Sequence, residues 1–174
     1  MNLRLRQIAA GGMILLLLGV ACYGVGVRVN TTGSMPVGLY RASGKPAKKG
    51  DYVMICPPPL GVFDLAMERG YIRAGFCPGG YGYLMKRILA AKDDTVTVAA
   101  DGVRVNGLLL PYSVPLKIDR AGRPLPRYQA DSYTLNEHQV LLMTDRNLYS
   151  YDGRYFGPVN RSQIKSVVLP IITW

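Results

Sequence analysis

The stretch IAAGGMILLLLGVACYGVGV, residues 8–27, divides this 174-residue chain into two unequal parts. It contains no charged side chain, and a helix of about 20 residues spans roughly 30 Å, the thickness of a bilayer core. Two arginines precede it, and only one basic residue, Arg28, follows it closely. Because cytoplasmic flanks carry the excess of Lys and Arg, we expect a cytoplasmic tail at 1–7, a transmembrane anchor at 8–27 and an exported domain at 28–174.

A cleaved signal peptide is the alternative interpretation of this N-terminal run. The letters LGVAC at 18–22 resemble a lipoprotein cleavage site. However, Gly19 stands where such sites normally carry an aliphatic residue, and the apolar run continues beyond it. The sequence therefore favours a retained anchor.

The charge balance is strongly basic, with 21 Lys and Arg against 11 Asp and Glu and a formal charge of +10. The basic residues are scattered and do not form one tract interleaved with aromatic residues, as nucleic-acid-binding surfaces often do. An exported domain beside a membrane also lies close to anionic headgroups. We expect partners among lipids or substrates and no nucleic acid.

The three cysteines fall in two environments. Cys22 lies within the apolar run, whereas Cys56 and Cys77 lie in the exported part, where disulfides persist. We expect a Cys56–Cys77 bridge. A metal site is not expected, because His138 is the sole histidine and neither exported cysteine belongs to a CxxC pair. No cofactor is implied.

The exported domain is predicted to be mainly β. Alternating or β-rich segments are GLYRAS (38–43), DYVMIC (51–56), GYLMKRILA (82–90), DTVTVAADGVRVNG (94–107) and HQVLLMT (138–144). Within the fourth, Asp101-Gly102 is typical of a tight hairpin.

Two other segments of the exported domain differ from these strands. Helical spacing at 60–71 indicates one short surface helix, which Gly70 ends. Residues 111–130 carry four prolines among charges, and we expect an extended loop that shapes a binding surface.

Ser34 lies in NTTGSMPVGLY, residues 30–40, just beyond the apolar run. A serine hydroxyl becomes a good nucleophile only beside a base. His138 with an aspartate would complete a triad, but it lies in a polar approach to a strand, and Ser34 lacks the GxSxG elbow. A surface role for His138 is therefore the better interpretation.

Lys86 is the stronger candidate for the base. On a strand it shares one face with Leu84 and Ile88, whereas Arg87 points to the opposite face. Burial disfavours the ammonium form, and a pKa lowered by about 2 to 3 units would let the amine accept a proton near neutral pH. A Ser-Lys dyad is physically feasible.

A third segment, DRNLYSYDGRYFGPV at 145–159, gathers many hydrogen-bonding side chains with aromatic residues and two glycines. By itself it also fits a salt-bridged surface turn. Loops on a rigid scaffold often carry function.

Together these segments resemble the bacterial type I signal peptidases, which are membrane-anchored serine proteases, and most closely their TraF-type relatives from conjugative plasmid transfer. SMP at 34–36 matches the nucleophile motif, KR at 86–87 the general-base motif, and SYDGRYFGPV at 150–159 the last box. The resemblance implies a compact signal-peptidase-like β fold after one transmembrane helix, in the bacterial inner membrane with the catalytic domain in the periplasm.

The resemblance also implies residue roles. Ser34 would be the nucleophile, Lys86 the general base, and Ser150 would help to hold the amine. Asp152 and Arg154 would brace the site, and Asp152 is also a catalytic candidate in the TraF branch.

For the oxyanion hole, the resemblance implies the Ser34 backbone N–H and the Thr32 hydroxyl as donors, with Thr31 as a substitute for Thr32. Two departures limit the comparison with the wider family. Pro36 directly follows Met35, as in the TraF branch, and residues 144–147 read TDRN where the family has GDNR.

By this resemblance the expected substrate is a pilin precursor, which is cleaved and in some cases cyclised, with inner membrane lipids and other conjugative transfer components as further partners. The rival hypothesis is a non-catalytic, membrane-tethered assembly protein of a pilus or secretion system. Self-cleaving repressors of the LexA type are disfavoured by the N-terminal span. The S-x-x-K pattern at 162–165 has no K-T-G after it and is interpreted as a strand edge.

Overall fold

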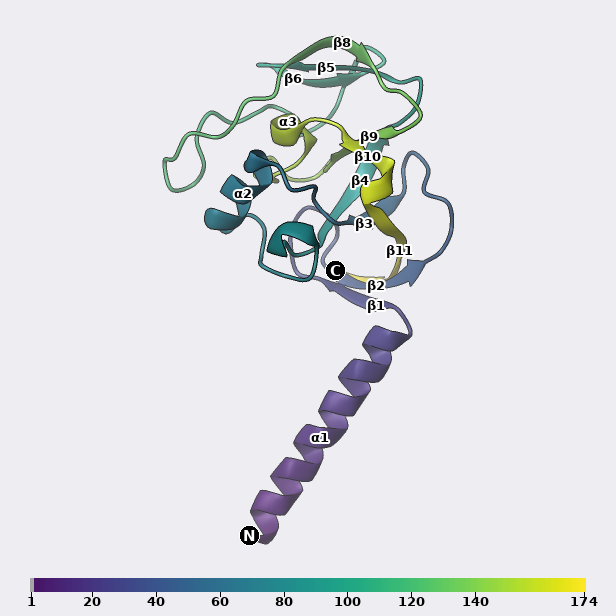
Figure 1. Ribbon diagram of the computed structural model, residues 1–174, viewed down its shortest axis with the longest axis vertical. Helices are drawn as coiled ribbons and strands as arrows, with labels where there is room; N and C mark the ends of the chain where they lie inside the picture. The colour runs from purple at the N-terminus through teal and green to yellow at the C-terminus, as the bar shows by residue number, and fades with distance from the viewer. Residues whose placement is uncertain (1) are drawn as a thin grey trace.

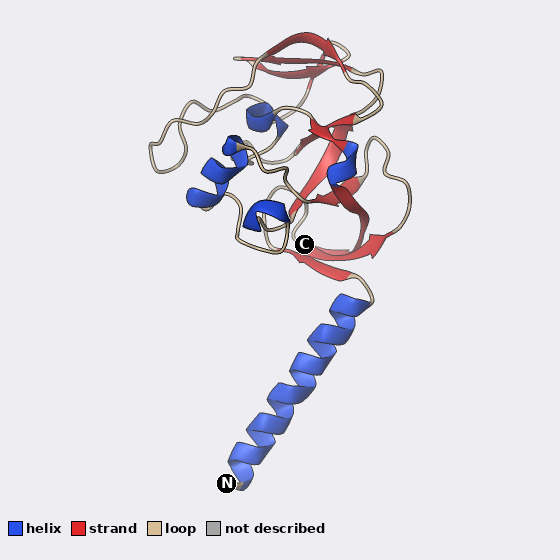
Figure 2. Ribbon diagram, in the orientation of Figure 1, coloured by secondary structure: helices blue, strands red, loops and turns tan. Residues whose placement is uncertain are grey.

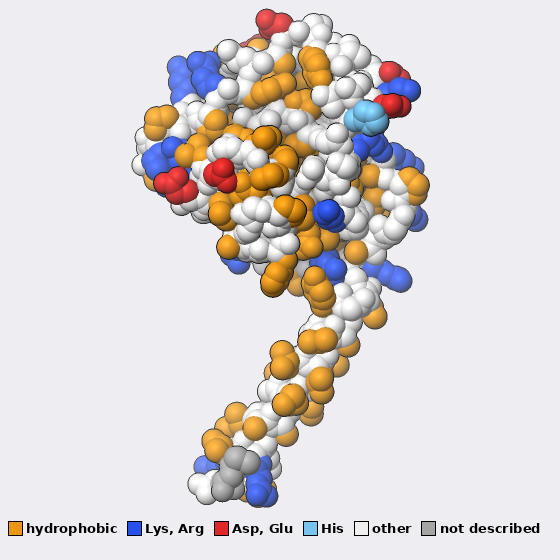
Figure 3. Space-filling view, viewed as in Figure 1, with side chains coloured by type: hydrophobic (Ala, Val, Ile, Leu, Met, Phe, Trp, Pro, Cys, Tyr) orange, Lys and Arg blue, Asp and Glu red, His pale blue; other side chains and the backbone are white. Residues whose placement is uncertain are grey.

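The computed structural model describes residues 2–174, and its N-terminal helix α1, Leu3–Gly24, projects away from the remainder of the chain (Figure 1). None of its residues is buried, and hydrophobic side chains cover its surface (Figure 3). Among the described residues it is the one helix long and apolar enough to cross a membrane, a property that signal sequences share. The helix begins earlier than the expected span at 8–27, and Val27 already belongs to a strand.

The larger of two sheets has seven antiparallel strands in the order β1-β2-β11-β3-β4-β9-β10. The strands are β1 (Val27–Asn30), β2 (Gly38–Ser43), β3 (Tyr52–Ile55), β4 (Leu84–Ala90), β9 (Gln139–Met143), β10 (Val159–Asn160) and β11 (Ile164–Thr173). The predicted mainly β fold is confirmed (Figure 2).

The smaller sheet has four antiparallel strands in the order β7-β6-β5-β8. They are β5 (Thr95–Ala99), β6 (Gly102–Val105), β7 (Leu108–Leu109) and β8 (Ala130–Thr134). The predicted hairpin is confirmed, because Ala99 pairs with Gly102 across the turn. A second apolar cluster packs this sheet against β4 and β9.

Short helices and one long loop complete the domain. The helices are α2 (Gly61–Glu68), α3 (Gly153–Phe156) and the two 3₁₀ turns η1 (Pro78–Gly80) and η2 (Arg161–Gln163). The helix α2 matches the segment predicted to be helical, but it is more than a surface helix, because Phe63 and Ala66 enter the main core. The loop at 111–130 contains no strand before β8 begins at Ala130.

A disulfide joins Cys56, directly after β3, to Cys77, just before η1. Both half-cystines are buried in the main core. The bridge therefore fixes the segment 57–76, which includes α2, to the central strands that carry the site.

Candidate active site

Ser34 lies in the short loop that joins β1 to β2, residues 31–37 (the Ser34 loop). The side chain of Asn30, the last residue of β1, reaches into the loop from one end. From β2, the hydroxyl of Tyr40 donates to the backbone oxygen of Pro36 at 2.6 Å. Both ends of the loop are thus fixed by side chains of the sheet edge.

The buried side chain of Asn30 organises the whole loop. Its Nδ2 lies 2.9 Å from the backbone oxygen of Thr32, 3.2 Å from that of Met35 and 3.0 Å from that of Pro36. Its Oδ1 accepts from both the backbone N–H and the hydroxyl of Thr32, at 3.2 and 2.9 Å. One amide therefore satisfies polar groups on both sides of Ser34, which sets the path of the loop.

Lys86 reaches Ser34 from the middle of β4. The alternation along this strand is confirmed: Leu84, Lys86 and Ile88 are buried, whereas the residues between them are partly exposed. The amine Nζ lies 2.6 Å from Ser34 Oγ and 2.9 Å from Ser150 Oγ. The two hydroxyl oxygens lie 3.1 Å apart, so the three groups form a closed triangle.

The environment of Lys86 favours a neutral amine. Burial lowers the pKa of Lys86 from 10.5 to about 8, while the charge of Asp152 raises it and that of Arg154 lowers it. Within residues 2–174 no carboxylate hydrogen-bonds to the amine, so desolvation outweighs the attraction of Asp152 for the ammonium form. An amine with this pKa is a competent base at neutral or slightly alkaline pH.

Asp152 and Arg154 form a fully buried ion pair beside the triangle. Arg154 donates from Nε at 2.7 Å and from Nη2 at 2.9 Å to the two carboxylate oxygens. The carboxylate also accepts from the Thr144 backbone N–H at 3.3 Å. Arg154 Nη1 donates to the backbone oxygens of Tyr112, at 2.5 Å, and Leu148, at 3.2 Å. Such a pair with its hydrogen bonds satisfied holds three chain segments together.

Neither member of this pair has a hydrogen bond to Ser34 or Lys86 among the described residues. Asp152 therefore acts on the lysine through its field and through the backbone it holds. Its geometry fits a positioning residue better than a proton carrier.

The expected oxyanion donors, Ser34 and Thr32, both lie in the Ser34 loop. The backbone N–H of Ser34 has no hydrogen-bond partner within residues 2–174, so it is available to a substrate oxygen. The Thr32 hydroxyl instead donates to Asn30 Oδ1, and it would have to rotate to reach an oxyanion. Thr31 is exposed and makes no side-chain hydrogen bond in the described structure.

Two asparagines that sequence reasoning did not single out contribute to the site. Asn30 is described above, and Asn147 contacts the Ser34 loop from the far side. A Cβ built on Gly33 would lie only 2.9 Å from Asn147 Nδ2. A signal for Asn147 existed, because it lies three residues before Ser150 in the polar loop already identified. Asn30 carried no comparable signal.

The rejected candidates lie elsewhere. His138 is exposed, and its Nε2 lies 3.3 Å from the Glu137 carboxylate. Ser162 belongs to η2 and Lys165 to β11, and both residues are exposed. The described residues hold no group of three or more His, Cys, Asp or Glu that could bind a metal ion.

Comparisons with known proteins agree with this architecture. The family described as signal peptidase, peptidase S26, matches residues 8–173. Two plasmid transfer proteins TraF of Escherichia coli are 66% and 61% identical to 98% and 97% of this chain, over 98% and 96% of their own lengths. The conjugal transfer protein TraF of Agrobacterium fabrum is 34% identical over 98% of this chain and 96% of its own length.

A solved signal peptidase I of Enterococcus faecalis V583 aligns with 72% of this chain and 98% of its own, at 18% identity and a TM-score of 0.39. The family match extends over nearly all of the chain, and the TraF proteins align with it over almost their full lengths. The chain therefore belongs to the signal peptidase family, peptidase S26, and groups with its TraF-type members.

Proposed function

We propose that this protein is a membrane-anchored serine endopeptidase in which Lys86 activates Ser34. The single observation that supports this most is the 2.6 Å contact between a buried amine of lowered pKa and a serine hydroxyl. Nucleophilic catalysis by serine requires a base within hydrogen-bond reach, which this contact supplies.

In the proposed mechanism the neutral Lys86 amine takes the proton of Ser34 Oγ as that oxygen attacks the scissile carbonyl carbon. The tetrahedral oxyanion receives a hydrogen bond from the Ser34 backbone N–H, with Thr32 as second donor after its hydroxyl rotates. The Lys86 ammonium then gives its proton to the leaving amine, and the C–N bond breaks. Ser150 keeps the amine aligned throughout.

The resulting acyl-enzyme is resolved in one of two ways. Water attack gives a linear product, whereas attack by an amine at the other end of the same chain gives a cyclic product. In either case Lys86 accepts the proton of the attacking group and returns it to Ser34 Oγ.

The long apolar N-terminal helix supports a location of the active site at a membrane. We propose a cytoplasmic tail at 1–7, a single inner-membrane span at 8–27 and a periplasmic peptidase domain at 28–174. Ser34 follows α1 after one short strand, so it would lie at the membrane surface, where the cleavage site of an inserted precursor emerges. The names of the TraF relatives support a role in conjugal transfer. As substrate we propose the pilin precursor that the family resemblance implies.

The experiment is processing of the pilin precursor in cells that carry the full-length protein or one of three variants. Ser34→Ala and Lys86→Ala should each abolish processing, whereas His138→Ala should process normally. Normal processing by either dyad variant would leave the protein as a tethered assembly component. Mass spectrometry of the product distinguishes hydrolysis from cyclisation, because the linear and cyclic products differ by one water.

A further inference from the structure

A cavity of about 370 Å³ lies between the 111–130 loop and the segment that carries Ser150. Its walls are mainly aromatic and aliphatic side chains, from Tyr71, Tyr149, Tyr151, Tyr155, Leu116 and Leu125. The loop is attached at both sides: Arg69, directly after α2, donates to the Pro124 backbone oxygen at 2.6 Å, and the Leu116 N–H donates to the Tyr155 hydroxyl at 3.0 Å. The cavity is thus part of the folded domain.

Three of the tyrosine hydroxyls in the walls already have hydrogen-bond partners within the protein. The Tyr71 hydroxyl donates to Asp119, the Tyr151 hydroxyl donates to the Val62 backbone oxygen, and the Tyr155 hydroxyl accepts from Leu116. What these residues offer to a ligand is therefore their aromatic surface, which suits an apolar or aromatic side chain.

The charges at the cavity are unequally matched. The Asp119 carboxylate accepts from Arg123 Nε at 2.7 Å and from the backbone N–H groups of Ala121 and Arg123, both at 2.8 Å. Arg123 is thereby paired with an acid. Arg120, in contrast, has no acidic partner among residues 2–174, and its guanidinium lies 4.2 Å from the centre of the Tyr149 ring. The cavity therefore presents one unmatched positive charge beside an aromatic wall.

The cavity also adjoins the dyad. Asn147 lines it, and the same side chain contacts the Ser34 loop at Gly33. Ser150, which holds the Lys86 amine, lies between two of the wall tyrosines in the chain. A peptide bound across Ser34 would thus pass the mouth of the cavity within a few residues of its scissile bond.

We propose that this cavity is a substrate subsite, which takes an apolar or aromatic side chain of the peptide with a carboxylate next to it, and that Arg120 binds this carboxylate. The carboxylate comes from an acidic side chain or from a free chain end, and the guanidinium suits both. The proposal rests on the proposed peptidase function for the identity of the ligand as substrate. The aromatic wall fixes the side chain, and Arg120 selects the charge.

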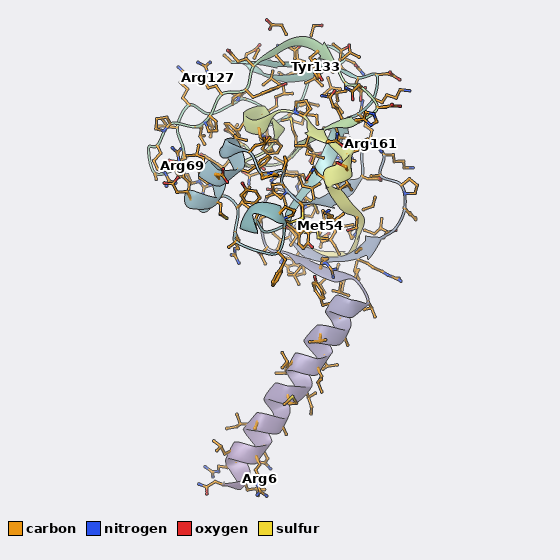
Figure 4. All side chains as sticks on the ribbon, in the orientation of Figure 1. Arg6, Met54, Arg69, Arg127, Tyr133 and Arg161 are labelled. Atoms are coloured by element: carbon orange, nitrogen blue, oxygen red, sulfur yellow. A yellow bond between two sulfur atoms is a disulfide. The ribbon has the colours of Figure 1, made fainter. Side chains whose placement is uncertain are left out.

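The kinetic arm compares Arg120→Gln with Arg127→Gln in the full-length protein in detergent micelles. Arg127 lies in the same loop but does not line the cavity, so it is the matched control for lost charge (Figure 4). For cleavage of the pilin precursor, Arg120→Gln should raise KM about threefold to tenfold, with a much smaller effect on kcat. Equal KM values for the two variants would overturn the role of Arg120.

The binding arm uses Ser34→Ala protein, so that it needs no turnover. N-acetyl-phenylalanyl-glutamate amide should bind more tightly than its glutamine or N-acetyl-glycyl counterparts in NMR titrations, and Arg120→Gln should remove the preference for glutamate. N-acetyl-phenylalanine, with a free terminal carboxylate, tests the second source of charge. No preference for either carboxylate would overturn the subsite. If the Ser34→Ala protein still processes the precursor, the peptidase proposal fails. The binding measurement still tests whether the cavity binds an aromatic side chain with a carboxylate.

Discussion

The amine of Lys86 lies 2.6 Å from the hydroxyl oxygen of Ser34, although the two residues are 52 positions apart in the sequence. The sheet order explains this proximity. Lys86 is on β4, four places across the sheet from β1, and the Ser34 loop that leaves β1 contacts β4 at the buried Lys86 side chain. The contact is therefore a tertiary property, made by strand order and by the loop that Asn30 holds.

The pH dependence of cleavage follows from this amine. Only neutral Lys86 accepts the serine proton, and its pKa is lowered to about 8. We expect kcat/KM to rise about tenfold per pH unit below that pKa and to level off above it, because kcat/KM reports groups of the free enzyme. Initial rates of the full-length protein from pH 6 to 10 measure this. A flat profile, with chemistry limiting, would exclude Lys86 as the base.

The strand pattern around Lys86 was predictable because alternation is a local property. Its buried face, the opposite orientation of Arg87 and the hairpin at Asp101 all follow from neighbours in the chain. The resemblance of the last box directed attention to Asp152 and Arg154. Their roles as a buried pair that holds distant backbone depend on contacts that no local pattern contains.

Strand β11 is an element that a local sequence rule argues against. It lies between β2 and β3, in the interior of the sheet, yet it contains Pro170, which argues against an interior strand because proline lacks an N–H. The conflict disappears at residue level, because β3 pairs with β11 only between Ile164 and Val167, so Pro170 has a partner strand on the β2 side alone. Asn30 could not be identified from local sequence either, because its amide has hydrogen-bond partners only once the Ser34 loop has folded around it.

Replacement of Lys86 by Met should stabilise the protein while it abolishes activity. The shift from 10.5 to about 8 corresponds to a penalty on the order of 3 kcal/mol for burial of the ammonium form. Met keeps the apolar stem, and the hydroxyls of Ser34 and Ser150, 3.1 Å apart, can bond to each other. We expect a gain on the order of 1–3 kcal/mol in the free energy of unfolding at pH 7.

The sign of the pH effect on stability provides the control. Between the folded pKa of about 8 and the unfolded value near 10.5, the unfolded chain binds more protons than the folded one, so the wild type gains stability as pH rises. The advantage of Lys86→Met should therefore shrink from pH 8 to 10. An advantage that stays constant over this range would show that burial of the charge is not its source.

Asn30→Asp should slow cleavage by misplacing Ser34. The substitution keeps an oxygen for Thr32 but sets a carboxylate oxygen against three backbone oxygens that now face Nδ2. We expect kcat to fall about tenfold to a hundredfold, with KM changed far less, because a displacement of about 1 Å at the nucleophile carries such a cost. Acylation kinetics with the precursor measure it. A change confined to KM would place Asn30 in binding instead.

Removal of the Cys56–Cys77 bridge should lower stability without touching the dyad. Its two ends are 21 residues apart, and a cross-link of that span reduces the entropy of the unfolded chain. We expect the paired Cys56→Ser and Cys77→Ser substitutions to lower the free energy of unfolding by about 3 kcal/mol. Cys22→Ser, which removes the free and exposed cysteine of α1, is the matched control and should leave stability unchanged. Denaturant titrations of the full-length proteins in micelles, with and without reductant, provide the comparison. If reductant lowers the midpoint of the paired variant as much as that of the wild type, the effect lies outside this bridge.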